Sequence, residues 1–163
     1  MALRTIRLLG DDVLKKKAKE VTKMNFRTQQ LIADMIETMH NAGGVGLAAP
    51  QVGILKAIVV IDLGEGPVIL INPEITAEEG SQTGDEGCLS VPGKQGVVTR
   101  PEKVTVKALD AQMNEIEITG ESLFARAICH EVDHLNGQMY VDLVEGELRD
   151  VTDEEDEKEA ESK

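Results

Sequence analysis

Two histidines separated by three residues give the strongest chemical signal in this sequence of 163 residues. His130, Glu131 and His134 form the pattern H-E-x-x-H, which holds two of the three histidines in the chain. On a helix, positions i and i+4 lie on one face about one turn apart, so both imidazoles can bind one metal ion. Glu131 would then lie near the open side of that ion. The pattern therefore predicts a metal site with a carboxylate placed for acid and base chemistry.

A third ligand is expected, because catalytic metal sites commonly have three protein ligands and one open position. Cys88 lies upstream, between a glycine and residues that favour turns. Its thiolate would complete a Cys/His/His set suited to Zn²⁺ or another divalent transition metal. Cys129 is the alternative donor, but it points about 100° around the helix from His130. We therefore expect Cys129 to be a small buried hydrophobic residue in the core.

The segment Gly43–Gln51 is rich in glycine. A phosphate-binding loop is excluded, because no G-x-x-x-x-G-K-[ST] pattern follows and the preceding element is a helix. Two interpretations remain. The segment is either a helix cap with a loop, or an extended stretch whose backbone N–H and C=O groups bind a peptide as an added strand.

Two helices are predicted to position these residues. The helix that carries the H-E-x-x-H pattern should span residues 122–136 and end at Gly137. An amphipathic helix should span residues 28–40, where apolar residues recur at helical spacing, and residues 41–44 should form its left-handed cap. In the helix that carries the H-E-x-x-H pattern, the expected core contacts are Leu123, Ala127, Ile128 and Leu135.

Short strands are predicted for much of the remainder. Residues 103–107 and 115–119 alternate polar with apolar or β-branched residues, and residues 110–114 are predicted to form the hairpin connection between them. The pattern indicates one α+β domain of short, mostly antiparallel strands packed around the helix that carries the chemistry. The expected strands are residues 57–62, 68–72, 97–100, 103–108 and 115–119.

The net charge of −13 is distributed unevenly. Residues 145–163 hold ten acidic and three basic residues, a net charge of −7, so the rest of the chain carries −6. This sign disfavours binding to nucleic acid. We expect a catalytic domain over residues 1–145 and a solvated acidic tail over residues 146–163, although residues 143–151 could begin a helix.

No apolar run approaches the length of a membrane span, and residues 1–10 contain no signal-peptide stretch. We therefore expect a cytoplasmic protein with no membrane partner. The two cysteines are expected to be reduced, because a chain of this size without an export signal has little need of a disulfide.

With these stretches considered together, the chain resembles the peptide deformylases. The resemblance rests on Gly44–Gln51, Glu86–Ser90 and His130–His134, which occur in the order found in that family. It covers roughly residues 5 to 145 and leaves out the acidic tail. It implies a hydrolase that removes the formyl group from N-formylmethionyl peptides and releases formate.

The resemblance also implies a role for each site residue. Cys88, His130 and His134 would hold one divalent ion per chain, Fe²⁺ in the cell, with Zn²⁺, Ni²⁺ or Co²⁺ as substitutes. Glu131 would be the acid and base. Gln51 and the backbone N–H of Leu89 would stabilise the oxyanion. The residues implied to bind substrate are Gly44, Val45, Gly46, Gly87, Arg100, Leu123 and Ala127.

The implied partners are nascent N-formylmethionyl chains at the ribosome, and we expect a monomer. A zinc endopeptidase is the enzymatic alternative, because H-E-x-x-H also occurs in metalloproteases. Such enzymes recruit a downstream His or Glu, and no histidine follows His134. A structural metal site would require a fourth protein ligand, and His40 is better explained as a cation at a helix C-terminus. A catalytically silent homologue is the remaining alternative.

Overall fold

The structure, a computed structural model, describes residues 2–151. It contains the two predicted α-helices, α1 (Phe26–Asn41) and α2 (Leu123–Leu135). Three 3₁₀ helices cover Asp12–Lys15, Ala49–Val52 and Tyr140–Asp142. The strands are β1 (Gly46–Ala48), β2 (Ile58–Ile61), β3 (Val68–Glu79), β4 (Gln82–Cys88), β5 (Val91–Arg100), β6 (Lys103–Leu109), β7 (Glu115–Glu121) and β8 (Glu145–Asp150).

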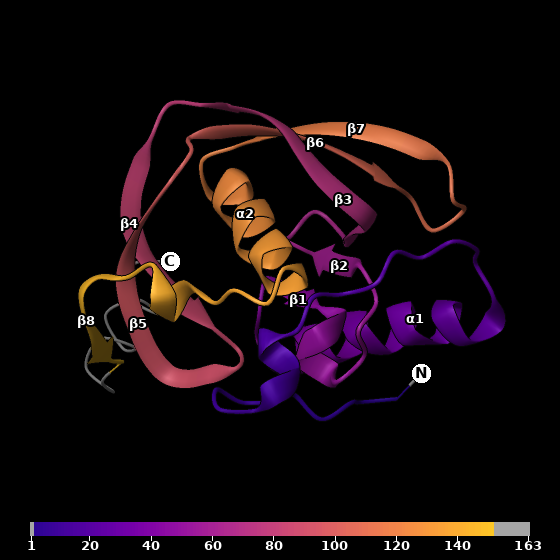
Figure 1. Ribbon diagram of the computed structural model, residues 1–163, viewed down its shortest axis with the longest axis horizontal. Coiled ribbons are helices and arrows are strands. Elements are labelled where there is room, and N and C mark those ends of the chain that lie inside the picture. The colour runs from indigo at the N-terminus through magenta and orange to yellow at the C-terminus, as the bar shows by residue number, and fades with distance from the viewer. Residues whose placement is uncertain (1, 152–163) are drawn as a thin grey trace.

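The strands form two antiparallel sheets around α2. One sheet has the strand order β1-β2-β3-β6-β7, and the other has the order β4-β5-β8. Figure 1 shows α2 in the middle of the molecule, with the small sheet on one side of it. The predicted class, α+β with mostly antiparallel strands around the helix that bears the motif, is confirmed.

Helix α1 begins at its cap, as its sequence dictates. The side chain of Asn25 accepts a hydrogen bond from the backbone N–H of Thr28 at 2.9 Å. The helix therefore starts two residues before the predicted range and ends one residue after it. Gly43, with a φ of 71°, supplies the left-handed turn beyond its end. The buried stripe of α1 packs under β1 and β2 and consists of Leu31, Ile32, Met35 and Met39.

Helix α2 lies within one residue of its predicted bounds at each end. Gly137 follows it with a φ of 75°, and a Cβ at that position would meet the backbone oxygen of Lys15 at 2.4 Å. Ala127, Ile128 and Leu135 are buried as expected. The core contact predicted for Leu123 is wrong, because this side chain is 56% exposed on the first turn of the helix.

All five predicted strands are present. β3 and β5 extend six residues or more beyond their predicted ranges, and β6 and β7 extend by one and two residues. The side chain of Asp110 accepts hydrogen bonds from the backbone N–H groups of Gln112 and Asn114, which holds the predicted hairpin turn. The sequence analysis missed β1, β4 and β8. No strand is predicted for residues 79–88, because glycine and polar residues dominate them and apolar residues do not alternate there.

The helix considered for residues 143–151 is wrong. Residues 145–150 form β8, which pairs with the edge of β5. Gly96 permits this pairing, because a Cβ there would meet Cγ2 of Val144 at 2.7 Å. The predicted boundary between catalytic domain and tail stays a prediction, and residues 152–163 of that tail lie outside the described part of the chain.

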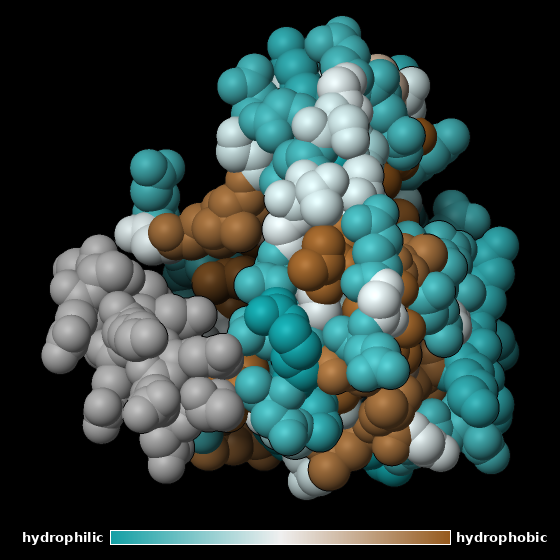
Figure 2. Space-filling view, turned by 90° about the vertical axis from the view of Figure 1, so that its left-hand side faces the viewer, coloured by the Kyte–Doolittle hydropathy of each residue, from teal (hydrophilic) through white to brown (hydrophobic). Residues whose placement is uncertain are grey.

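The side of the molecule that carries β4, β5 and β8 has a mixed surface. Figure 2 shows hydrophobic residues exposed there among hydrophilic ones. Between residues 2 and 151, neither helix is long and apolar enough to cross a membrane.

Candidate metal centre

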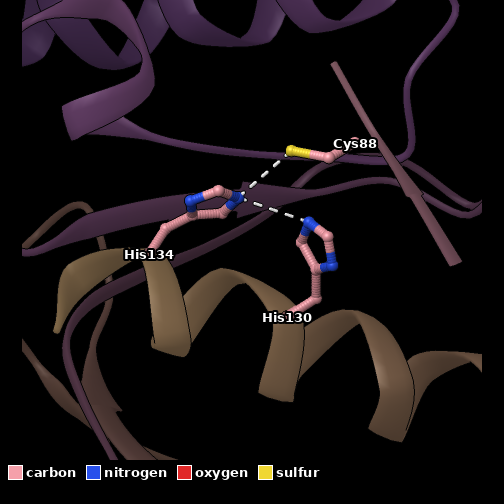
Figure 3. Close-up of side chains that lie close together, drawn as sticks. All are labelled: Cys88, His130 and His134. Carbon is pink, nitrogen blue, oxygen red and sulfur yellow. Dashed lines mark hydrogen bonds between the residues drawn. The ribbon is translucent and has the colours of Figure 1, made fainter. Parts of the chain in front are cut away.

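Three donor atoms from two elements converge beside α2. His130 and His134 project from one face of the helix, and their Nε2 atoms lie 3.3 Å apart. The Sγ of Cys88, at the end of β4, lies 3.3 Å from Nε2 of His134. Figure 3 shows the sulfur and both rings directed toward one point. The structure therefore brings together the three residues predicted as ligands, all of whose donor atoms lie within 4.8 Å of one another.

This donor set fits one transition-metal ion. Bonds of about 2.0–2.3 Å to a tetrahedral ion place neighbouring donors about 3.3–3.7 Å apart, which matches the observed spacing. Cys88, His130 and His134 form the complete set of clustered donors found among the described residues. No fourth His, Cys, Asp or Glu in residues 2–151 joins them, which favours a site with one open position over a structural metal site.

Glu86 fixes the orientation of one ligand. Its Oε1 lies 2.7 Å from Nδ1 of His130, so this nitrogen donates and Nε2 keeps its lone pair for a metal ion. Arg100 binds the same carboxylate through two nitrogens at 2.8 and 2.9 Å, and Arg126 donates to it at 2.6 Å. Burial opposes the charge of Glu86, but the hydrogen bonds from Arg100 and His130 lower its pKa to about 2.

This arrangement contradicts the expectation that Arg100 contacts the peptide. Its side chain is buried, two of its nitrogens bind Glu86, and the third donates to Asp133 at 2.6 Å. Arg100 is also absent from the described residues that line the cavity beside the ligands. It therefore supports the carboxylate behind His130. A sequence pattern alone does not distinguish a surface arginine on a strand from one that is paired inside.

We expect Glu86→Gln to weaken metal binding about 10- to 100-fold, the usual effect of losing a partner behind a histidine ligand. The variant also leaves the guanidinium groups of Arg100 and Arg126 with less compensating charge. The free energy of unfolding should therefore fall by about 3 kcal/mol or more. A competition titration with a metal chelator and urea unfolding measure the two effects. Unchanged metal affinity in the folded variant would contradict the role of Glu86.

Glu131 lies beside the ligands with an unsatisfied carboxyl group. It is buried, and its Oε1 has no hydrogen-bond partner in the described part of the chain. Its Oε2 faces β1 so closely that a Cβ on Gly46 would lie 2.5 Å from it. Burial raises the pKa of Glu131 to about 7. This carboxyl group is therefore suited to exchange protons near neutral pH.

Gln51 is held so that its amide NH₂ group faces the ligands. Its Oε1 accepts a hydrogen bond from the backbone N–H of Ala48 at 2.9 Å. Its Nε2 donates to Oγ of Ser90 at 3.1 Å and lies 3.4 Å from Sγ of Cys88. Ala48 stands at the end of β1, so the strand and the 3₁₀ helix after it orient this donor.

A cavity of about 490 Å³ opens beside the metal centre and is lined by two of the ligands, Cys88 and His130. It lies between β1 and β4, which are edge strands of the two different sheets. Gly44 approaches Leu89 so closely that a Cβ on the glycine would lie 2.6 Å from Cδ1 of the leucine. Apart from Arg100, every residue predicted to bind substrate or stabilise the oxyanion lines this cavity: Gly44, Val45, Gly46, Gln51, Gly87, Leu89, Leu123 and Ala127.

The sequence analysis assigned no role to three residues at this centre. One is Glu86, which fixes the ring of His130; the others are Arg126 and Tyr140. Arg126 lies four residues before His130, hence one turn earlier on the same helix face, and this spacing could have identified it. Tyr140 stacks on His130 with ring centroids 5.9 Å apart, and no sequence signal pointed to that contact.

The remaining cysteine and histidine lie where the sequence analysis placed them. Cys129 is buried in the core cluster around α2, and burial raises the pKa of its thiol to about 11. Its thiol is therefore protonated and poorly nucleophilic at neutral pH. His40 lies at the C-terminal end of α1, where its Nε2 is 2.8 Å from Oδ2 of Asp62.

Comparisons with known proteins agree on one family. A family model described as polypeptide deformylase matches residues 3–149. The chain is 63% identical over 155 residues to the peptide deformylase of Agathobacter rectalis, covering 95% of this chain and 98% of that protein. It is 60% identical over 148 residues to peptide deformylase 1 of Clostridium acetobutylicum, covering 90% of this chain and 99% of the relative.

Solved structures give the same result. A crystal structure of a peptide deformylase from Legionella pneumophila superposes with a TM-score of 0.85 at 46% identity, covering 88% of this chain and 86% of that one. A peptide deformylase from Synechococcus elongatus in complex with actinonin also gives a TM-score of 0.85 at 46% identity, covering 86% and 78%. The chain belongs to the polypeptide deformylase family.

Proposed function

We propose that this chain hydrolyses the formyl group of N-formylmethionyl peptides, releasing formate and a free α-amine. The observation that carries the proposal is the set of Cys88, His130 and His134 beside the buried carboxyl group of Glu131. The relatives named peptide deformylase support it, since they match this chain over nearly its whole length. An endopeptidase is not favoured, because the third donor is a cysteine upstream of the motif.

Cys88, His130 and His134 are the proposed ligands of one divalent ion per chain. When bound, such an ion supplies Lewis-acid chemistry, which polarises a carbonyl group and lowers the pKa of water. We propose Fe²⁺ as the ion in the cell, with Zn²⁺, Ni²⁺ or Co²⁺ as substitutes. One thiolate and two imidazoles are donors that first-row divalent metals accept.

Glu131 is the proposed acid and base. Its carboxylate would take the proton of the attacking water and later deliver it to the departing amine. A pKa of about 7 suits both steps, because the group gains and loses a proton at little cost near neutral pH. Its unsatisfied Oε1 leaves one oxygen without a competing partner from the described residues.

Gln51 and Leu89 are the proposed oxyanion donors. The amide of Gln51 is fixed before substrate binds, because Ala48 and Ser90 hold its oxygen and its nitrogen. Leu89 directly follows the ligand Cys88, so its backbone N–H lies next to the centre. Donors oriented in advance stabilise developing negative charge without the cost of reorganisation during the reaction.

The peptide is proposed to bind as a strand between the free edges of β1 and β4. Gly44, Val45 and Gly46 would pair with it on one side, and Gly87 on the other. Leu123 and Ala127 would contact the methionine side chain. The exposure of Leu123 fits this role, since a bound side chain would cover it.

The proposed partners are nascent chains at the ribosome, met in the cytoplasm by a monomer that binds no nucleic acid directly. The high acidic content of the sequence supports the last point.

Product analysis tests the proposed reaction. The metal-loaded chain is incubated with formyl-Met-Ala-Ser, and the products are separated and identified by mass. We expect formate and intact Met-Ala-Ser. Cleavage between amino acids would instead indicate an endopeptidase, and loss of neither formyl group nor amino acid would indicate a silent homologue.

A further inference from the structure

Strand β8 is tied to the wall of the cavity. It pairs with β5 in a register that places Lys94 opposite Asp150. Beyond the strand, the backbone N–H of Val151 donates to the carbonyl oxygen of Gly93 at 2.8 Å. Gly93 and Lys94 both line the cavity. The end of β8 therefore lies against the hairpin that forms one side of the proposed peptide site.

Two exposed charges border this cavity on the same side. Of the acidic and basic residues that line it, Glu86, Arg126 and Glu131 are buried. Asp85 and Lys94 remain accessible to solvent, with side chains 48% and 46% exposed. A peptide in the cavity would therefore meet these two charges in contact with water.

Each of these two charges is paired with β8. The Nζ of Lys94 contacts the carboxylate of Asp150. The guanidinium group of Arg149 contacts the carboxylate of Asp85, which lies two strands away on β4. Strand β8 thus supplies the oppositely charged partner of each residue, Arg149 for Asp85 and Asp150 for Lys94. Because the field of an ion pair falls off faster with distance than that of a single charge, the pairing weakens the field of both residues in the cavity.

The position of Asp85 indicates which part of a peptide would respond. It precedes the ligand Cys88 by three residues on β4. Because the register shifts between Glu86 and Cys88, the two residues lie at most about 10 Å apart along the strand. A peptide lying along β4 from the metal centre has the same rise per residue. The side chain of its third residue would therefore pass near Asp85.

We propose that β8 controls the charge preference of the cavity toward the third residue of the peptide, by neutralising Asp85 with Arg149 and Lys94 with Asp150. The proposal rests on the proposed function and refines it. Removing either partner should expose the charge that it neutralises. Arg149→Gln would favour a basic third residue, and Asp150→Asn would favour an acidic one.

The test compares formyl-Met-Ala-Lys with formyl-Met-Ala-Glu as substrates of the metal-loaded full chain. We expect Arg149→Gln to raise the ratio of their kcat/KM values about two- to fivefold, and Asp150→Asn to lower it by a similar factor. The change should lie in KM and should shrink in 0.5 M salt. All three peptides carry a C-terminal amide, so that formyl-Met-Ala-Gln is uncharged, and the activity of both variants on it should stay near that of the unsubstituted chain.

Matched control variants separate this local effect from net charge. Lys107→Gln changes the net charge as Arg149→Gln does, and Glu117→Gln changes it as Asp150→Asn does. Lys107 and Glu117 face each other on β6 and β7 and do not line the cavity. Both control variants should leave the ratio unchanged.

We expect the ratio of kcat/KM values to rise in Arg149→Gln and to fall in Asp150→Asn. A general loosening of β8 would instead move this ratio in the same direction in both variants. Shifts of the same sign, no shift, or equal shifts in the controls would overturn it. These outcomes leave the proposed function intact as long as the unsubstituted chain releases formate from formyl-Met-Ala-Gln. A full chain that releases no formate from that peptide would overturn both proposals.

Discussion

Replacing Glu131 with alanine is expected to lower the rate of formate release about 10²- to 10⁴-fold, the usual contribution of a positioned acid and base. The carboxyl group is buried beside the ligands, and its raised pKa lets it carry the proton from water to the amine. Water itself is a far weaker base at neutral pH. The measurement is kcat for formyl-Met-Ala-Ser at saturating substrate.

The metal content of the variant decides how this loss is interpreted. Glu131 is not among the clustered donors, so Glu131→Ala should retain one metal ion per chain. Glu117→Gln removes an exposed carboxylate from β7 and serves as the control with unchanged kcat. Turnover within threefold of the full chain, with metal retained, would remove Glu131 from the mechanism.

The second large effect is expected for Gln51→Ala. Loss of one donor to a developing oxyanion typically costs about 10²- to 10³-fold in kcat. Binding of substrate in its ground state should change less, so KM should stay within a few-fold. We expect the variant to retain its metal ion, because Gln51 is not one of the three proposed ligands. Its amide nitrogen only donates to the sulfur of Cys88. Steady-state kinetics together with metal analysis measure both quantities.

Gln51 also has structural contacts, so the variant needs a stability control. Gln51→Ala leaves the backbone N–H of Ala48 without its partner, which costs about 1–3 kcal/mol when the group is buried. Urea unfolding should detect this cost separately from turnover. Gln112→Ala, at an exposed hairpin turn, provides the matched variant with normal kcat. A stable Gln51→Ala enzyme with near-normal turnover would exclude Gln51 from oxyanion stabilisation.

The parts of the fold that local sequence determines were predictable. The bounds of α2 follow from its apolar spacing and from Gly137, whose left-handed backbone and close contact with Lys15 admit no side chain. The i, i+4 spacing of His130 and His134 determines that both rings share a helix face. Their convergence with a cysteine from another element was inferred from residue types, and it appears in the geometry of the site.

The features that sequence reasoning missed depend on distant segments. Arginine on a strand is usually a surface charge, and the contacts of Arg100 with Glu86 and Asp133, which hold it inside, come from other segments of the chain. Leu123 follows the helical pattern of core residues, yet no element covers the first turn of α2 at that position. Strand β8 forms because β5 has an open edge, which no property of residues 145–150 alone reveals.

Formate release by the chain prepared anaerobically with ferrous iron tests the central claim most directly. We predict release from formyl-Met-Ala-Ser by the full chain with one ion bound, and loss of release after chelation that is restored by added Fe²⁺. Glu131→Ala, carrying the same ion, should release formate at least about 10²-fold more slowly. A chain that binds one ion per molecule and releases no formate would contradict the account.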